Sequence, residues 1–140
     1  MAALSHASVI LPFWGMIASV VIWVTQKDKS AYVRFQALQA VAFHITQFLL
    51  FFVGMGCYMC SFFGNFLAIP LFAGGAESGD APPPLFFVTF LLPFVVMGAF
   101  FLGWFLWIVY GLVAAVLALQ GKDFRYFIIG NRLHSYLEAK

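Results

Sequence analysis

Long apolar stretches separated by short polar segments dominate the pattern along this chain. They run from about residue 5 to 25, from about 31 to 73, and from about 85 to 119. Each reaches the roughly 20 apolar residues that a helix needs to cross the hydrocarbon of a bilayer. The pattern therefore predicts an all-α integral membrane protein. We expect one membrane domain, a bundle of three transmembrane helices followed by an amphipathic tail over residues 120–140.

The second stretch is too long for one straight crossing, so its first turns are expected to lie in the membrane interface. The glycines of "FVGMG" also predict a possible break near residues 54–56. If the chain turned back there, the same sequence would form four helices. Three crossings and four crossings therefore both remain open.

Charge changes this picture by giving it an orientation. All seven Lys and Arg residues lie in residues 27–34 or in the tail, whereas the segment "AGGAESGDAPPP" holds two acids and no base. The positive-inside rule then places the N-terminus and the acidic loop outside, and the first loop and the tail in the cytoplasm. This predicts a multi-pass protein of the cell inner (cytoplasmic) membrane. The basic residues expected at lipid headgroups are Lys27, Lys29, Arg34, Lys122, Arg125 and Arg132.

Polar residues on the second stretch fall on one side of a helix, within an arc of about 100°. They are Gln36, Gln39, Thr46, Gln47, Gly54, Cys57, Ser61 and Asn65. Lipid offers no hydrogen-bond partners, so this stripe should face protein or water. One interpretation is a helix interface or partner-binding face, and the other is a wet path.

Candidate chemistry is sparse. His44 lies near the edge of the stripe, and a histidine in a membrane segment is a candidate proton carrier or haem ligand. No second axial ligand is evident, so a hydrogen-bonded structural histidine is the preferred interpretation. Two cysteines are too few for a disulfide framework. We expect no cofactor and no metal site, although a structural lipid would fit.

The tail mixes aromatic and basic residues, which predicts that it lies on the inner leaflet. The alternative is that it docks onto the basic first loop through Asp123 or Glu138. The sequence leaves both open.

Two segments carry a family resemblance: "KDKSAYVRFQALQAVAFHI" and "GKDFRYFIIGNRL". They resemble the cytoplasmic signatures of a family of small bacterial polytopic membrane proteins of unknown function. That family is related to the roughly twenty-kilodalton membrane subunit of the plastid inner-envelope import translocon. The resemblance implies a helical membrane fold with a basic cytoplasmic loop. It implies no catalytic residues, and this chain has Gln36 and Ala31 where the family often has histidine and proline.

Three functional hypotheses follow. A net charge of +2 is too small to indicate nucleic acid, and the sequence shows no nucleophile with a base and no paired carboxylates. The leading hypothesis is therefore a non-catalytic accessory, structural or assembly subunit of a larger membrane complex, respiratory or photosynthetic for example. Its partners would be membrane lipids and other membrane subunits or further copies of itself. The alternatives are a homo-oligomeric, translocon-like conduit and a haem- or quinone-binding redox subunit using His44.

Overall fold

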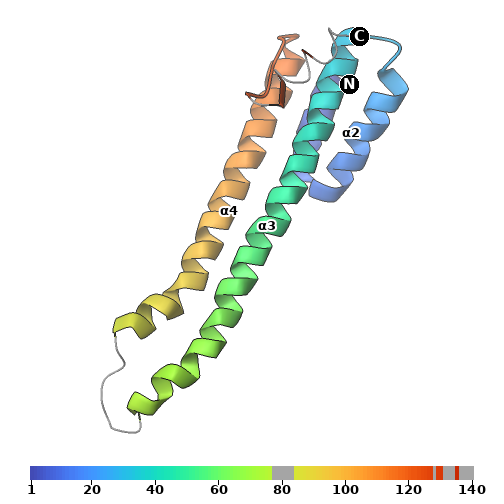
Figure 1. Ribbon diagram of the computed structural model, residues 1–140. Coiled ribbons are helices and arrows are strands. Elements are labelled where there is room, and N and C mark those ends of the chain that lie inside the picture. The colour runs from blue at the N-terminus through green and yellow to red at the C-terminus, as the bar shows by residue number, and fades with distance from the viewer. Residues whose placement is uncertain (77–83, 128, 131–134, 136–140) are drawn as a thin grey trace. The chain divides into compact units, whose positions relative to one another are not determined.

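The computed structural model describes residues 1–76, 84–127, 129, 130 and 135 (Figure 1). Its elements are α1 (Ala2–Ala7), the 3-10 helix η1 (Ser8–Ile10), α2 (Pro12–Gln26), α3 (Ala31–Ala76) and α4 (Pro84–Leu119). Within these residues the fold has four α-helices and no strand, which confirms the all-helical class and fits the alternative of four helices. The acidic loop with Glu77 and Asp80 lies outside the described residues.

Two helices are long and apolar enough to cross a membrane, α3 over Ala31–Pro70 and α4 over Pro84–Leu119. The shorter apolar helix of the N-terminal region covers Phe13–Gln26. Three crossings are therefore not confirmed. α3 also runs through residues 54–56 without the predicted break.

The region predicted as one helix from about residue 5 to 25 is divided by a turn. Pro12 begins α2, and Leu11 before it has φ −110° and ψ 88°, outside the helical range. Proline fits the first turn of a helix and disfavours helical geometry in the residue before it, so one helix ends and another begins here. α2 then returns alongside α1 (Figure 1). Gly15 permits this return, because a Cβ there would overlap the Ser8 carbonyl oxygen.

The chain forms two compact units, one made of Met1–Leu49 with Phe105–Lys140 and the other of Leu50–Trp104. In the first unit, which we call unit 1, Val9 packs against Gly111 of α4. A Cβ on Gly111 would lie 2.8 Å from Val9 Cγ1, so the glycine allows close approach. Its core comprises Val9, Phe43, Ala114 and Tyr126, with a second cluster of Ala2, Ala3 and Ala118 beside Tyr32 and Val33.

α4 ends in a Schellman motif that turns the chain back toward α3. The Gly121 N–H donates to the Ala118 carbonyl at 3.2 Å, and the Lys122 N–H donates to the Leu117 carbonyl at 3.1 Å. Gly121 has φ +72°, a conformation that favours glycine. The Tyr32 hydroxyl then donates to the Lys122 carbonyl at 3.0 Å. The segment after α4 is thereby fixed beside the start of α3.

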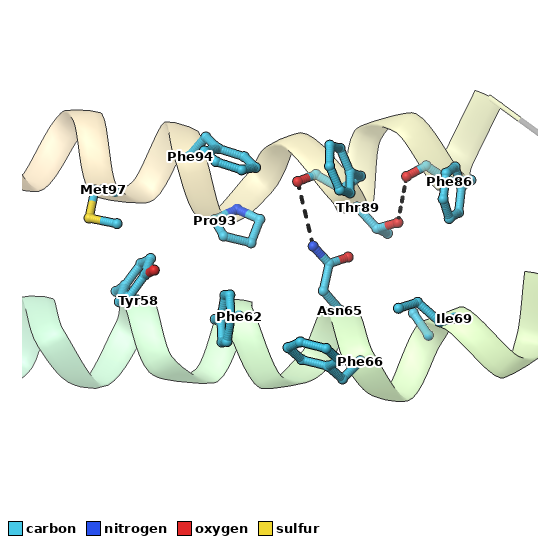
Figure 2. A pocket seen from close by; sticks show the side chains of 12 residues that line it. Tyr58, Phe62, Asn65, Phe66, Ile69, Phe86, Thr89, Pro93, Phe94 and Met97 are labelled. Atoms are coloured by element: carbon cyan, nitrogen blue, oxygen red, sulfur yellow. Dashed lines mark hydrogen bonds between the residues drawn. The ribbon is translucent and has the colours of Figure 1, made fainter.

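The second unit, unit 2, pairs the later part of α3 with the earlier part of α4. Gly54 faces the Phe100 ring so closely that a Cβ would overlap it. Farther along, an apolar groove of about 250 Å³ lies between the two helices, with Tyr58, Phe62, Asn65, Phe86, Phe90 and Pro93 among its lining (Figure 2). Pro93 lacks the N–H that would bond the Thr89 carbonyl one turn earlier. The Asn65 amide reaches across the groove to the Phe90 carbonyl at 3.5 Å.

Candidate functional site

Unit 1 buries an unusual number of polar side chains for so apolar a protein. Burying a polar group without a hydrogen bond is costly, and lipid supplies no partner. The hydrogen bonds of these groups therefore show which segments of the chain they join. The buried polar residues are Ser5, His6, Ser19, Gln36, Gln39, His44 and Gln47.

Gln36 and Gln39, three residues apart on α3, hold the backbone of the segment after α4. Both side-chain amides donate to the Phe124 carbonyl at 3.1 Å. The Gln36 amide also donates to Asp123 Oδ1 at 3.2 Å. In return the Tyr126 N–H donates to Gln39 Oε1 at 3.1 Å. These two residues, the glutamine clamp, thus satisfy backbone groups of a segment that is not itself helical.

His6 of α1 lies between this clamp and Tyr126. Its Nε2 is 3.0 Å from Gln36 Oε1 and its Nδ1 is 2.9 Å from the Tyr126 hydroxyl. Since the Gln36 NH₂ group already faces two acceptors, its oxygen must face His6, which makes Nε2 the donor. Nδ1 then accepts from Tyr126. For a neutral imidazole, these two neighbours select the tautomer with the proton on Nε2.

Burial favours the same neutral form. His6 lies outside the two membrane-length helices, and desolvation lowers its pKa from 6.5 to about 4. The Gln36 bond raises the pKa in part, and the nearby His44 lowers it further. Burial likewise raises the pKa of the Tyr126 hydroxyl, with a smaller contribution from Tyr110. Both groups are therefore uncharged at neutral pH.

The Tyr126 ring anchors the tail in the core. It stacks on Phe43 with ring centroids 4.3 Å apart, and Trp107 stacks on the opposite side of Phe43 at 4.4 Å. Tyr110 meets the edge of Tyr126 at 5.2 Å. Tyr126 is 2% exposed, so an aromatic residue beyond α4 is a central core residue.

A second group of polar side chains surrounds the turn between α1 and α2. The hydroxyls of Ser8 and Ser19 each approach the Ser5 carbonyl, at 2.8 and 2.9 Å. Ser8 Oγ also lies 3.1 Å from the Gly15 carbonyl. Backbone groups that leave a helix need other hydrogen-bond partners when they are buried. These serines therefore stabilise the turn.

His44 of α3 also contacts the turn between α1 and α2. Its Nε2 is 3.2 Å from Ser8 Oγ and its Nδ1 is 3.3 Å from Gln47 Oε1. Within the described residues, the Gln47 amide nitrogen and the indole nitrogens of Trp23 and Trp107 are buried without a hydrogen-bond partner. Both ring nitrogens of each histidine therefore have a hydrogen-bond partner, whereas the Gln47 amide nitrogen has none in the described part of the chain.

The structure separates the predicted polar stripe into groups with different surroundings. Gln36, Gln39 and Gln47 enter the buried network of unit 1. The Thr46 and Ser61 hydroxyls bond carbonyls of their own helix, those of Ala42 and Tyr58. Gly54 and Asn65 belong to unit 2, and the role predicted for the stripe as a whole stays a prediction. Cys57 is exposed and not disulfide-bonded.

The predicted headgroup residues that the structure describes lie at one end of unit 1. Lys27, Lys29, Arg34 and Lys122 are exposed, and Arg125 pairs with Asp123 at 2.9 Å. Arg132 and Glu138 lie outside the described residues. Asp123 bonds Gln36 and its neighbour Arg125 rather than the basic first loop.

Sequence reasoning missed His6, Ser8 and Tyr126 as members of this site. The topology that charge predicts puts His6 near a membrane surface away from the tail, yet it contacts Tyr126 directly. The spacing of Ser8, Gly15 and Ser19 does signal close packing, but within one helix rather than across a turn. Among the described residues, no group of three or more His, Cys, Asp or Glu side chains is placed to hold a metal ion.

The comparisons with known proteins agree with a small membrane protein. No curated protein and no solved structure matches the chain. A family match is found, but it shows no link to the plastid import translocon that the two cytoplasmic motifs suggested. The sequence model of that family covers residues 1–133, nearly the whole chain. The chain belongs to the magnetosome magnetite crystal formation protein family, MamF_MmsF.

Proposed function

We propose that this chain is a non-catalytic protein of the magnetosome membrane with a structural or assembly role in magnetite crystal formation. The family membership supports the compartment and the process. The absence of catalysis is our own inference from the site. An accessory subunit of a larger membrane complex is the finer form of the proposal.

The structural role rests on one observation, which is that the buried polar side chains form hydrogen bonds to other segments of the same chain. The glutamine clamp bonds the tail backbone. The serines around η1 bond the turn between α1 and α2. These side chains hold segments of the chain together, as architectural residues do, and so a reaction is not needed to explain them.

The same observation favours this role over the two alternatives. A solute path would require the glutamines to line an open channel, whereas Gln36, Gln39 and Gln47 are at most 1% exposed within a single chain. A haem ligand would require a ring nitrogen without a competing partner. Both nitrogens of His6 and both of His44 have polar neighbours at 2.9 to 3.3 Å. We accordingly expect no haem, with lipid as the only bound small molecule.

Deleting the gene in a magnetosome-forming bacterium that carries it tests the role. We expect the magnetosome fraction of the wild type to contain the protein, and the deletion to change crystal size or shape in electron micrographs without abolishing the mineral. Complementation with the wild type should restore the crystals. A Gln36→Leu/Gln39→Leu variant should not, although its membrane abundance must be measured by immunoblot. Thr46→Val, which removes a bond within one helix, is the matched control.

Unchanged crystals after deletion would overturn the proposed process. The subunit form has a separate test, which is purification from native membrane in mild detergent followed by mass spectrometry of co-purifying chains. A stoichiometric larger partner supports an accessory subunit. Recovery of a pure oligomer that passes solute in liposomes would favour the conduit instead.

A further inference from the structure

Every charged side chain in the part of the chain that the structure describes lies at one end of unit 1. Residues 27–29 form the turn between α2 and α3, Arg34 is in the first turn of α3, and residues 122–125 follow α4. The Tyr32–Lys122 hydrogen bond of 3.0 Å joins the second and third of these segments. Segments that are about 90 residues apart in sequence thus form a single charged belt. Its members are Lys27, Asp28, Lys29, Arg34, Lys122, Asp123 and Arg125.

The belt is strongly positive and largely unneutralised. It contains five basic and two acidic side chains, which leaves a net charge of +3. All seven residues are exposed. The ion pair found among these residues joins Arg125 and Asp123 at 2.9 Å. Lys27, Lys29, Arg34 and Lys122 therefore present their charges without an acidic partner in the described structure.

The backbone of the belt is held in place. The Lys27 N–H donates to the Trp23 carbonyl at 2.9 Å and the Lys29 N–H to the Gln26 carbonyl at 3.0 Å, which defines the turn. Lys122 is held through both its N–H and its carbonyl. The glutamine clamp fixes the next residues. Ordering the backbone in advance lowers the entropy lost when a ligand binds.

Apolar surface adjoins these charges. Phe127 is 82% exposed, two residues from Arg125. Leu119, at the end of α4, is 76% exposed. Cations next to an exposed aromatic ring and apolar helix ends match a membrane interface, where charge meets the headgroups and the rings meet the upper acyl chains.

We propose that this belt binds the headgroups of anionic phospholipids, and that Lys29, Arg34 and Lys122 select them over zwitterionic lipids. Charge complementarity identifies the partner, because a phosphate-bearing headgroup with net negative charge is the anion available at the end of a membrane helix. This inference goes beyond the proposed function and does not depend on it. A protein with no part in crystal formation could still select lipid in this way.

The test uses the full chain in nanodiscs that contain equal amounts of phosphatidylglycerol and phosphatidylcholine. After gentle release into detergent, native mass spectrometry counts the lipids that remain bound. We expect retained phosphatidylglycerol to exceed phosphatidylcholine roughly fivefold for each basic residue that contacts a headgroup. High salt should reduce the excess, because screening weakens contacts between exposed charges.

Two triple variants make the test specific. Lys29→Gln/Arg34→Gln/Lys122→Gln should bring the retained lipids to the ratio of the bulk bilayer. Lys29→Arg/Arg34→Lys/Lys122→Arg keeps every charge and should keep the excess. Circular dichroism checks that both remain helical. If the neutral variant does not fold, the wild-type melting temperature in the two pure lipids replaces it, and we expect the higher value in phosphatidylglycerol. Equal retention of the two lipids by the wild type, or an excess that survives neutralisation, would overturn the proposal.

Discussion

Gln39 makes two hydrogen bonds to the tail backbone, so its loss should release the tail. In Gln39→Leu the Tyr126 N–H would be buried without a partner. Such a group destabilises a fold by about 1–3 kcal/mol. We expect a lower melting temperature in detergent and faster tryptic cleavage after Lys122 and Arg125. Thr46→Val is the control for both measurements, and equal cleavage of Gln39→Leu and wild type would contradict the clamp.

His6 should make stability depend on pH. Its pKa is about 4 in the fold and 6.5 in the unfolded chain, so between these values the unfolded chain binds the proton more readily. The contribution of His6 to the free energy of unfolding is fully present above pH 6.5 and declines as the pH falls. Near pH 4 it has fallen by about 3 kcal/mol, since a pKa difference of one unit corresponds to 1.36 kcal/mol. The free energies of unfolding of wild type and His6→Gln, measured at a series of pH values, should therefore converge as the pH is lowered. Parallel curves would argue against a buried neutral His6.

At the residue scale, the sequence predicted which side chains needed neighbours but not which neighbours they have. Gln36, Gln39 and Gln47 stand out because amides are rare in apolar helices. The partners of the two clamp glutamines are 85 to 88 residues away in sequence. The periodicity of one helix carries no information about such distant pairs. Tyr126 was hidden for the same reason, since it lies in a segment without a helical pattern.

At the element scale, the sequence indicated the long helices well and the N-terminal turn poorly. The predicted stretches 31–73 and 85–119 differ by only a few residues from α3 and α4, because apolar length and the flanking polar segments define them. Pro12 is compatible with a kinked helix as well as with a new helix start. The return of α2 alongside α1 depends on bonds from Ser8, Ser19 and His44, which are set by tertiary contacts.

A comparison of two glycine-to-alanine variants tests the tight turn between α1 and α2. In Gly15→Ala the new Cβ would overlap the Ser8 carbonyl and crowd the His44 ring, which overpacks the turn. We expect destabilisation of about 1–3 kcal/mol. A Cβ added to Gly98 of α4 would meet nothing within 4 Å, so Gly98→Ala should be neutral or stabilising by up to about 1 kcal/mol. Thermal unfolding in detergent compares the two, and a Gly15→Ala variant as stable as Gly98→Ala would count against the tight turn.

At the scale of the whole molecule, the N-terminal turn changes the side of the membrane expected for the N-terminus. Ala2 and Ala3 pack against Ala118 beside Tyr32 and Val33, so the start of the chain lies at the basic end of unit 1. If that end is cytoplasmic, as the positive-inside rule requires, the N-terminus is cytoplasmic too. α1, η1 and α2 would then enter the membrane and return, and α3 and α4 would supply the crossings.

Fusions at the two ends of the chain decide between this topology and three crossings with an external N-terminus. We expect green fluorescent protein to fluoresce at either end, and alkaline phosphatase to be inactive at either end, because both ends would face the cytoplasm. Three crossings would instead give an active phosphatase at the N-terminus only. The Lys and Arg residues are cytoplasmic in both topologies, which is why charge could not separate them. The topology with both ends inside rests on the bonds of Ser8 and Ser19 to the Ser5 carbonyl, which hold the turn between α1 and α2.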